Sequence, residues 1–351
     1  MVLASLCAIA LLRTQDLGYI FEPIQPLGMR ESRLSVSEPL KDLPQYEGSA
    51  RVELLWNDQP TGMILPRSHQ LQFFGMDGKK NTYFSVQTTK DGDFTIRGAR
   101  PIFAGANGFE ALPLPTKDTY FGLEDVNQKG DAVFTVETPT APKKTFSLKQ
   151  VPYGYLFKDG KWTNFGRARN LKIDEAGNVA GITEVEGMND KARKMAFTYS
   201  GDKVEMQGDA NTALMSPKGE ALFFTWSEGY KVIDEVRRLR SAADRASIVS
   251  QGKRRSVTFV EGDLPYAFWA EGVYVAKHWE DINPGAFFLV IKELRFKLND
   301  ISQLPPACRV MMVGRPGADG SLVVGLTDGR VVRYGVLRPN ESLKSVIASS
   351  T

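Results

Sequence analysis

The hydrophobic positions of this chain come in short runs that are separated by glycine turns. Three segments share one order of residues: an apolar residue, then Asn, Asp or Ser, two variable positions, Gly, a polar residue and a short apolar run. They are 126–133 (VNQKGDAV), 173–180 (IDEAGNVA) and 215–222 (MSPKGEAL), with looser copies at 90–96 and 318–326. The Asn, Asp or Ser side chain bonds the backbone two residues on, and Gly accepts a positive φ. Each segment therefore predicts a tight turn that enters a β-strand.

A second pattern, an aromatic strand that runs into another turn, alternates with the first. It occurs at 155–160 (YLFKDG), 196–201 (AFTYSG) and 266–272 (YAFWAEG). The two patterns keep phase: Gly160 and Gly201 are 41 residues apart, and Gly177 and Gly219 are 42 apart. A period near forty with several short strands per unit is typical of blades in a β-propeller. The sequence therefore predicts an all-β chain, a β-propeller of about seven blades.

These alternating motifs resemble the HAF-repeat family of bacterial propeller-like proteins. The units of that family read approximately as Ile-Asn-x-x-Gly-x-Val-Val-Gly and Ala-Phe-Leu-Trp-x-x-Gly. The match is best over about 120–275, where Gly181 fits the last glycine of the first motif, whereas Val133 and Leu222 depart from the pattern near that position. The resemblance implies the fold and says little about function.

Two segments break the strand pattern: residues 29–50, which are polar and rich in turn residues and predict a long surface connection, and residues 231–256. Ile233, Val236, Leu239, Ala243 and Ala246 fall at helical spacing, which predicts a helical insertion near 233–248. No segment of linker composition divides the chain, so we expect a single β-propeller domain over 1–351. The alternative is an N-terminal β-domain over 1–115 followed by a smaller propeller over 116–351.

The two ends of the chain are expected to meet. Propellers close by pairing strands from both termini in one blade, which removes an exposed sheet edge. The apolar segment at 3–12 is therefore predicted to form a strand near 308–314 or 321–336. Closure of this kind could bring Cys7 and Cys308 close together, and we expect two free buried thiols there.

Composition argues against nucleic-acid binding, zinc binding and a membrane span as features of this protein. The net charge of +3 is too slight to make nucleic acid the expected partner. Two cysteines and two histidines, none at motif spacing, argue against a zinc site, and no cofactor is expected. The apolar N-terminus has no basic residue before Arg13 and is too short to span a membrane. We expect a cytoplasmic protein, or a periplasmic one if residues 1–12 belong to an atypical export signal.

No motif for a catalytic nucleophile, a phosphate-binding loop or a dinucleotide is present. His278 lies beside Trp279, Glu280 and Asp281 and could act as a general base, but a histidine in a surface loop is the simpler interpretation. Paired carboxylates could serve a propeller hydrolase. The candidates are Asp91, Asp93, Glu124, Asp125, Asp174 and Glu175. All of them are also residues that turns prefer.

These observations favour a non-catalytic protein that binds another protein through a broad rigid surface. The sharper hypothesis is a bacterial inhibitor or immunity protein that sequesters a toxin or effector. The alternatives are a carbohydrate-active or other hydrolytic propeller, and a structural subunit of a larger assembly. The predicted partner-binding residues are mostly basic and suit an acidic protein surface. They are Arg237, Arg238, Arg240, Arg245, Lys253, Arg254, Arg255, His278 and Trp279.

Overall fold

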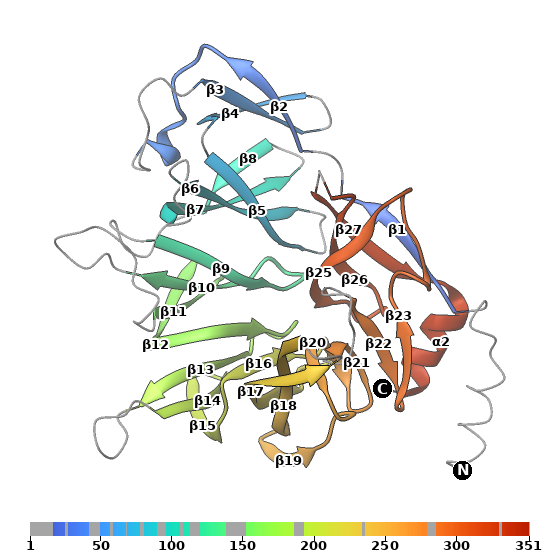
Figure 1. The fold of residues 1–351 in the computed structure, drawn as a ribbon. Coiled ribbons are helices and arrows are strands. Elements are labelled where there is room, and N and C mark those ends of the chain that lie inside the picture. Colours follow the sequence, from blue (N-terminus) through green and yellow to red (C-terminus); the bar gives the residue numbers. More distant parts are fainter. Residues whose placement is uncertain are drawn as a thin grey trace. The chain divides into compact units, whose positions relative to one another are not determined.

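The computed structural model of this chain is all-β apart from a short 3-10 helix and one α-helix among the residues that it describes (Figure 1). Those residues are 17–24, 27–41, 50–56, 59–67, 69–77, 81–89, 96–105, 108–112, 120–137, 152–185, 193–233, 236–278, 286–329 and 332–350. The chain divides into two compact units. One unit combines residues 1–24 with 207–351, and the other spans residues 25–206.

Three sheets form the 25–206 unit, and in each sheet the strands pair in sequence order. The first contains β2 (Leu27–Ser32), β3 (Arg51–Trp56) and β4 (Gln59–Pro66), with the 3-10 helix η1 (Glu38–Leu40) between β2 and β3. The second contains β5 (His69–Met76), β6 (Thr82–Thr89), β7 (Ile96–Gly105) and β8 (Gly108–Ala111). The third has seven strands: β9 (Tyr120–Val126), β10 (Ala132–Glu137), β11 (Tyr153–Lys158), β12 (Lys161–Ile173), β13 (Val179–Val185), β14 (Arg193–Ser200) and β15 (Lys203–Asp209).

The seven-stranded sheet consists of two four-stranded meanders that share β12. Residues 161–167 of this long strand pair with β11, and residues 168–173 pair with β13. The strand changes partner just after Gly166. The φ angle of Gly166 is 75°, a backbone conformation that glycine adopts readily and that residues with a side chain resist. One strand therefore ends one meander and begins the next, which explains why the two sequence motifs keep phase.

The other unit also contains three sheets. One has the order β16 (Thr212–Met215), β17 (Ala221–Ile233), β18 (Val236–Ser250) and β19 (Lys253–Val257). The next has β20 (Asp263–Ala270), β21 (Val273–His278), β22 (Phe288–Ile291) and β23 (Leu294–Lys297). The third joins β24 (Ser302–Gln303), β25 (Arg309–Pro316), β26 (Leu322–Thr327) and β27 (Val332–Pro339) to the N-terminal strand β1 (Tyr19–Pro23).

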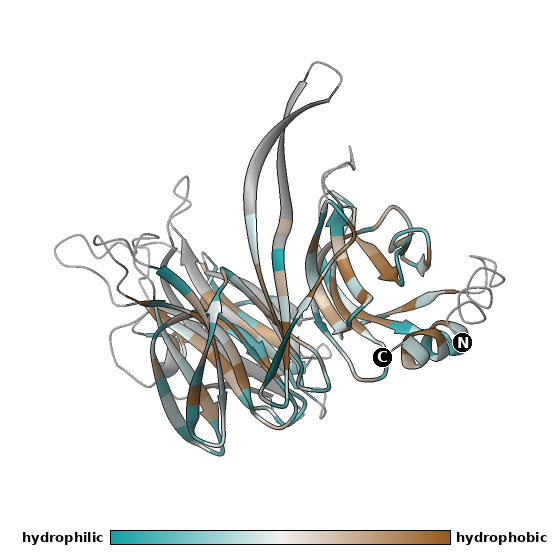
Figure 2. Ribbon diagram, turned by 90° about the horizontal axis from the view of Figure 1, so that it is seen from below, coloured by the Kyte–Doolittle hydropathy of each residue, from teal (hydrophilic) through white to brown (hydrophobic). Residues whose placement is uncertain are grey.

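The predicted turns at 126–133, 173–180 and 215–222 are confirmed in atomic detail, whereas most of the looser copy at 90–96 lies outside the described residues. In the first, the Asn127 N–H donates to Asp131 O, and Asn127 Oδ1 accepts from the Lys129 N–H two residues on. Asp174 does the same in the second turn, where its Oδ1 accepts from the Ala176 N–H at 2.8 Å. Gly130 has a φ of 89°, as such a turn requires. Figure 2 shows hydrophobic residues along the strands and hydrophilic residues at many of the turns between them.

The N-terminal strand completes the C-terminal sheet. β1 pairs antiparallel with β27, from Tyr19 opposite Pro339 to Pro23 opposite Gly335. A strand near the N-terminus therefore closes the sheet as expected, but residues 19–23 form it, and the predicted segment 3–12 lies outside the described residues. Cys308 is a free thiol that accepts a hydrogen bond from Arg333 Nη1, and Cys7 also lies outside the described residues.

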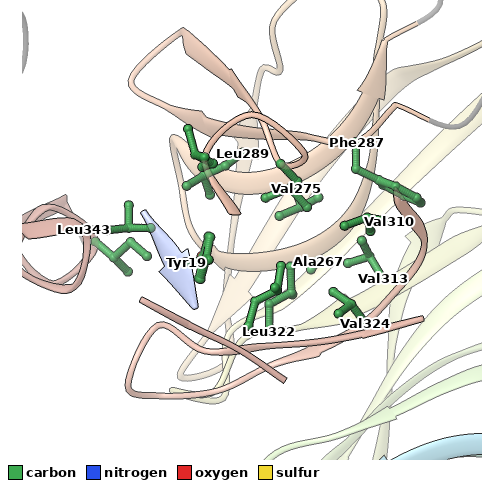
Figure 3. Packing of buried hydrophobic residues seen from close by; sticks show 14 of the residues in the cluster. Tyr19, Ala267, Val275, Phe287, Leu289, Val310, Val313, Leu322, Val324 and Leu343 are labelled. Atoms are coloured by element: carbon green, nitrogen blue, oxygen red, sulfur yellow. The ribbon is translucent and has the colours of Figure 1, made fainter. Parts of the chain in front are cut away.

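The core of this unit lies where the β20–β23 sheet packs against the sheet that contains β25–β27. Figure 3 shows Ala267, Val275 and Leu289 of the first sheet close to Val310, Leu322 and Val324 of the second. Tyr19 of β1 is completely buried among them, and its hydroxyl group donates to Gly320 O at 3.2 Å. Burial of this aromatic side chain attaches the N-terminal strand to the core.

Residues 233–248 do not form the predicted helix. They belong to a β-hairpin in which β17 and β18 pair from Ala221 opposite Val249 to Ile233 opposite Val236. The pairing shifts by one residue at Asp244, because Thr225 lies opposite Arg245 whereas Trp226 lies opposite Ala243. A bulge of this kind interrupts the period of two. Ala243 and Ala246 therefore pack against the same hydrophobic cluster although they are three residues apart, a spacing that resembles a helix.

The helix that does form was missed by the sequence interpretation. It is α2 (Glu341–Ser350), which buries Leu343, Val346 and Ile347. Asn340 caps it, because Asn340 Oδ1 accepts a hydrogen bond from the Leu343 N–H at 2.9 Å. An Asn before Glu341 and an apolar pattern at i, i+3 and i+4 are the features that could have predicted it.

Candidate functional site

The β17–β18 hairpin holds most of the predicted partner-binding residues. Its strands have 13 and 15 residues, whereas the corresponding β13 and β14 have 7 and 8. β16 pairs with residues 221–224 of β17, and β19 pairs with residues 246–250 of β18. Beyond those residues the two strands of the hairpin are paired with each other. The excess of six residues in one strand and seven in the other corresponds to roughly 20–23 Å of additional two-stranded ribbon.

The predicted basic residues occupy this hairpin and the strand beside it. Arg237, Arg238 and Arg240 lie opposite Val232, Lys231 and Gly229 near the end of the hairpin. The four others are exposed: Arg245 lies on β18, and Lys253, Arg254 and Arg255 are the first three residues of β19. The pairing of β18 with β19 thus brings the residues from the two parts of the sequence into one sheet.

Two of these exposed arginines have partners within the fold. Arg254 Nε donates to Ser247 Oγ at 3.0 Å, and Arg255 forms an ion pair with Glu271. Exposed ion pairs contribute little to stability, about 0–1 kcal/mol, so these arginines can exchange partners at low cost.

His278 does not lie in a surface loop. It is the last residue of β21, directly opposite Asp263 of β20, and its side chain is only 10% exposed. Its Nδ1 atom is 2.9 Å from Asp263 Oδ1. The sequence neighbours that suggested a base, Glu280 and Asp281, lie outside the described residues, as does Trp279. Strand pairing, rather than proximity in sequence, supplies the carboxylate of this histidine.

Asp263 is the centre of a buried polar cluster. Its side chain is 1% exposed, and its Oδ2 accepts from the Tyr274 hydroxyl at 2.9 Å. Arg295 Nη2 lies 3.0 Å from Asp263 Oδ1, and the Val260 N–H donates to the Tyr274 oxygen. Burial, and the charge of Asp263, raise the pKa of Tyr274. The partners surround Asp263 closely, so the cluster serves to hold β20, β21 and β23 together.

Three of the carboxylates considered for hydrolysis accept hydrogen bonds from main-chain N–H groups. Asp125 Oδ2 accepts from the Ile173 N–H at 3.1 Å, and Glu175 Oε2 accepts from the Gln128 N–H at 2.9 Å. Asp174 caps its own turn. Asp91 and Asp93 lie outside the described residues. Glu124 differs from the others because, among the described residues, its carboxyl group bonds only a side-chain hydroxyl, that of Thr135 at 3.2 Å.

Neither a metal-binding cluster nor a membrane-spanning helix is found among the described residues. Among them, no three or more His, Cys, Asp or Glu side chains are grouped so that they could hold a metal ion. Within the same residues, no helix has both the length and the apolar character needed to cross a membrane.

No protein-family model and no curated protein sequence matches this chain. The structure is similar to solved β-propeller structures. The propeller domain of the trilobed protease from Pyrococcus furiosus is 8% identical, with a TM-score of 0.47, over 78% of this chain and 85% of that one. A gluconolactonase from Xanthomonas campestris is 11% identical, with a TM-score of 0.38, over 91% and 100%. An α-L-arabinofuranosidase from Podospora anserina is 10% identical, with a TM-score of 0.33, over 94% and 98%. The HAF-repeat resemblance stays a prediction, and similarity at these levels assigns no activity.

Proposed function

We propose that this protein is a non-catalytic, protein-binding β-propeller of about seven blades. The meanders support this number. The 25–206 unit contributes the sheets β2–β4 and β5–β8 and the two halves of the seven-stranded sheet. The other unit contributes three sheets, one of them completed by β1. In five of the six sheets the strand order follows the sequence as in a propeller blade, and the sixth has the order β24-β1-β27-β26-β25.

The observation that carries the binding function is the basic β17–β18 hairpin. It is about twice as long as the strands that correspond to it, and no blade needs the additional length for its own pairing. Between residues 237 and 255 the sequence has seven basic residues and one acid, Asp244. Such a charge density speeds the approach of an acidic partner, and Arg forms bidentate bonds to carboxylates.

The partner class that fits this hairpin is a protein with an acidic surface. A toxin or effector held by a bacterial inhibitor or immunity protein is the specific form of this proposal, with a cytoplasmic site of action. Carboxylates that accept hydrogen bonds from main-chain N–H groups, Asp125 and Asp174 among them, favour binding over hydrolysis as the function. Nucleic acid is the less favoured partner because the net charge of the whole chain is only +3.

The test combines partner capture with charge reversal. Pull-down with the full chain identifies the partner, and the affinity is then measured at 50 and 300 mM salt. We expect the triple variant Arg237→Glu, Arg238→Glu, Arg240→Glu to bind more than about tenfold more weakly, chiefly through slower association, with an unchanged melting temperature. Affinity that is unchanged in this variant would refute the role of the hairpin.

A matched control separates local from global charge effects. Lys161, Lys194 and Lys203 are exposed residues of β12, β14 and β15, and their reversal to Glu changes the net charge by the same amount. We expect this control variant to bind within about twofold of wild type. Equal weakening in both triple variants would show that only the net charge matters.

A further inference from the structure

A different site lies in the 25–206 unit, where the first strands of two successive meanders meet. Glu124 of β9 occupies a bulge, because Asp125 lies opposite Val133 whereas Leu123 lies opposite Phe134. Arg169 and Lys172 of β12 flank a second irregularity, at which Asn170 has a φ of 50°. Similar register shifts recur in β5–β6 and β20–β21, so bulges are a general feature of this fold. Bulges direct side chains to new positions, and here the side chains are charged.

Hydrogen bonds between the two strands fix these charges in place. The Ile173 N–H donates to Asp125 Oδ2 at 3.1 Å, and Lys172 Nζ lies 3.3 Å from the main-chain oxygen of Glu124. The carboxyl group of Glu124 itself accepts from Thr135 Oγ1 at 3.2 Å. The acid and the two cations therefore approach one another from strands that are more than forty residues apart in sequence.

The cations at this site are incompletely bonded. Arg169 Nε is buried and has no hydrogen-bond partner within the part of the chain that the structure describes. The only acceptor found there for Lys172 is the neutral carbonyl oxygen of Glu124. A buried donor that lacks an acceptor costs about 1–3 kcal/mol, so such donors usually have a partner.

The pKa of Glu124 is shifted by its burial and by these neighbouring charges. Burial raises the pKa of its carboxyl group, against the opposing influence of Lys172, Thr135 and Arg169, and the charge of Asp125 adds to the increase. A raised pKa means that this carboxyl group loses its proton at a higher pH than an exposed glutamate does, so its negative charge beside Arg169 and Lys172 depends on pH. Perturbed ionisable groups of this kind are concentrated at functional sites.

We propose that Arg169 and Lys172 bind the oxyanion group of a small molecule, a carboxylate or a phosphate, with Glu124 beside it. The guanidinium group of Arg169 offers planar N–H donors that match an oxyanion, and Lys172 adds a second positive charge. Protonated Glu124 can donate a hydrogen bond to the same ligand. This site is independent of the partner-binding hairpin, which belongs to the other unit.

The first experiment uses sulfate as the probe, because its charge is constant above about pH 4. Calorimetric titration of the full chain with sodium sulfate should show saturable binding, and Arg169→Gln should weaken it at least about tenfold. Arg167→Gln is the matched control: Arg167 is exposed on the same strand and should be replaceable without effect. Sulfate also stabilises proteins without binding to a site, so equal responses in the two variants, or no saturable binding to wild type, would overturn the proposal.

The second experiment keeps the proposal testable if Arg169→Gln fails to fold. Lys172→Met should weaken sulfate binding by about tenfold while the chain remains folded, and unchanged affinity would count against the site. In wild type the affinity should fall as the pH rises and Glu124 ionises beside Asp125. Glu124→Gln should remove that dependence, and a pH profile that is the same in this variant would contradict the proposed place of Glu124. Parallel titrations with phosphate and acetate would show which oxyanion the site prefers.

Discussion

Two clusters of polar and charged side chains, one around Asp263 and the other around Glu124, differ in how completely their charged groups are paired. Both bring a carboxyl group and an arginine together across strand pairs. Asp263 contacts a tyrosine hydroxyl, a histidine and Arg295. Glu124 bonds one threonine hydroxyl, and the nearby Arg169 is not bonded to it.

The difference separates a structural cluster from a candidate ligand site. Arg295 Nε also lacks a hydrogen-bond partner, but Arg295 is held through Nη2 by Asp263 and by Glu261 O. The guanidinium group of Arg169 has no such anchor among the described residues. A polar cluster in which the charges are paired makes a fold more rigid, whereas a cation that no carboxylate holds in place is available for a ligand.

The largest effect is expected from Asp263→Asn. The substitution keeps the shape of the side chain but removes the negative charge beside Arg295 and His278. Loss of one member of a buried ion pair leaves an uncompensated charge, and we expect a loss of about 3 kcal/mol in the free energy of unfolding. The midpoint of urea unfolding measures it. A loss below about 1 kcal/mol would show that the cluster is not structural.

A smaller effect is expected from Tyr274→Phe, which deletes one hydroxyl group. Asp263 Oδ2 then loses a donor and the Val260 N–H loses an acceptor. The expected loss is about 1–2 kcal/mol, measured in the same urea titration. Tyr266→Phe is a suitable control, since Tyr266 is exposed and its substitution should change stability by less than about 0.5 kcal/mol. Equal stability of the two variants would contradict the assignment.

The smallest effect is expected at Glu124, and it should depend on pH. Because the pKa of Glu124 is higher in the folded chain than in the unfolded one, the folded state binds the proton more tightly. Its contribution to stability is therefore present below the ordinary Glu pKa of about 4.3 and is lost as the pH rises through the raised pKa. Glu124→Gln should equal wild type in stability near pH 4 and exceed it at pH 8, by less than about 1 kcal/mol. A difference that stays constant between these pH values would contradict this account.

Local chemistry explains which features could be predicted. The turns at Asn127 and Asp174 depend on side chains that bond their own backbone and on a glycine three residues later, so a few consecutive residues determine them. The all-β class follows from the repetition of those turns. Arg245 and Lys253, which were predicted to bind a partner, are exposed. The side chain of His278 is mostly buried, because strand pairing places it opposite Asp263, fifteen residues earlier in the chain.

By itself, the sequence therefore determined the turns, the short strands and their period, because these depend on contacts within a few residues. Tertiary structure decided the rest. Pairing with β17 makes residues 236–248 part of a strand, and the bulge at Asp244 produces there the spacing that resembled a helix. Contact between β9 and β12 brings Glu124 to Arg169 and Lys172, which no local pattern indicates. Strand pairing joins residues far apart in sequence, so its register, and each site that depends on it, is a property of the folded chain.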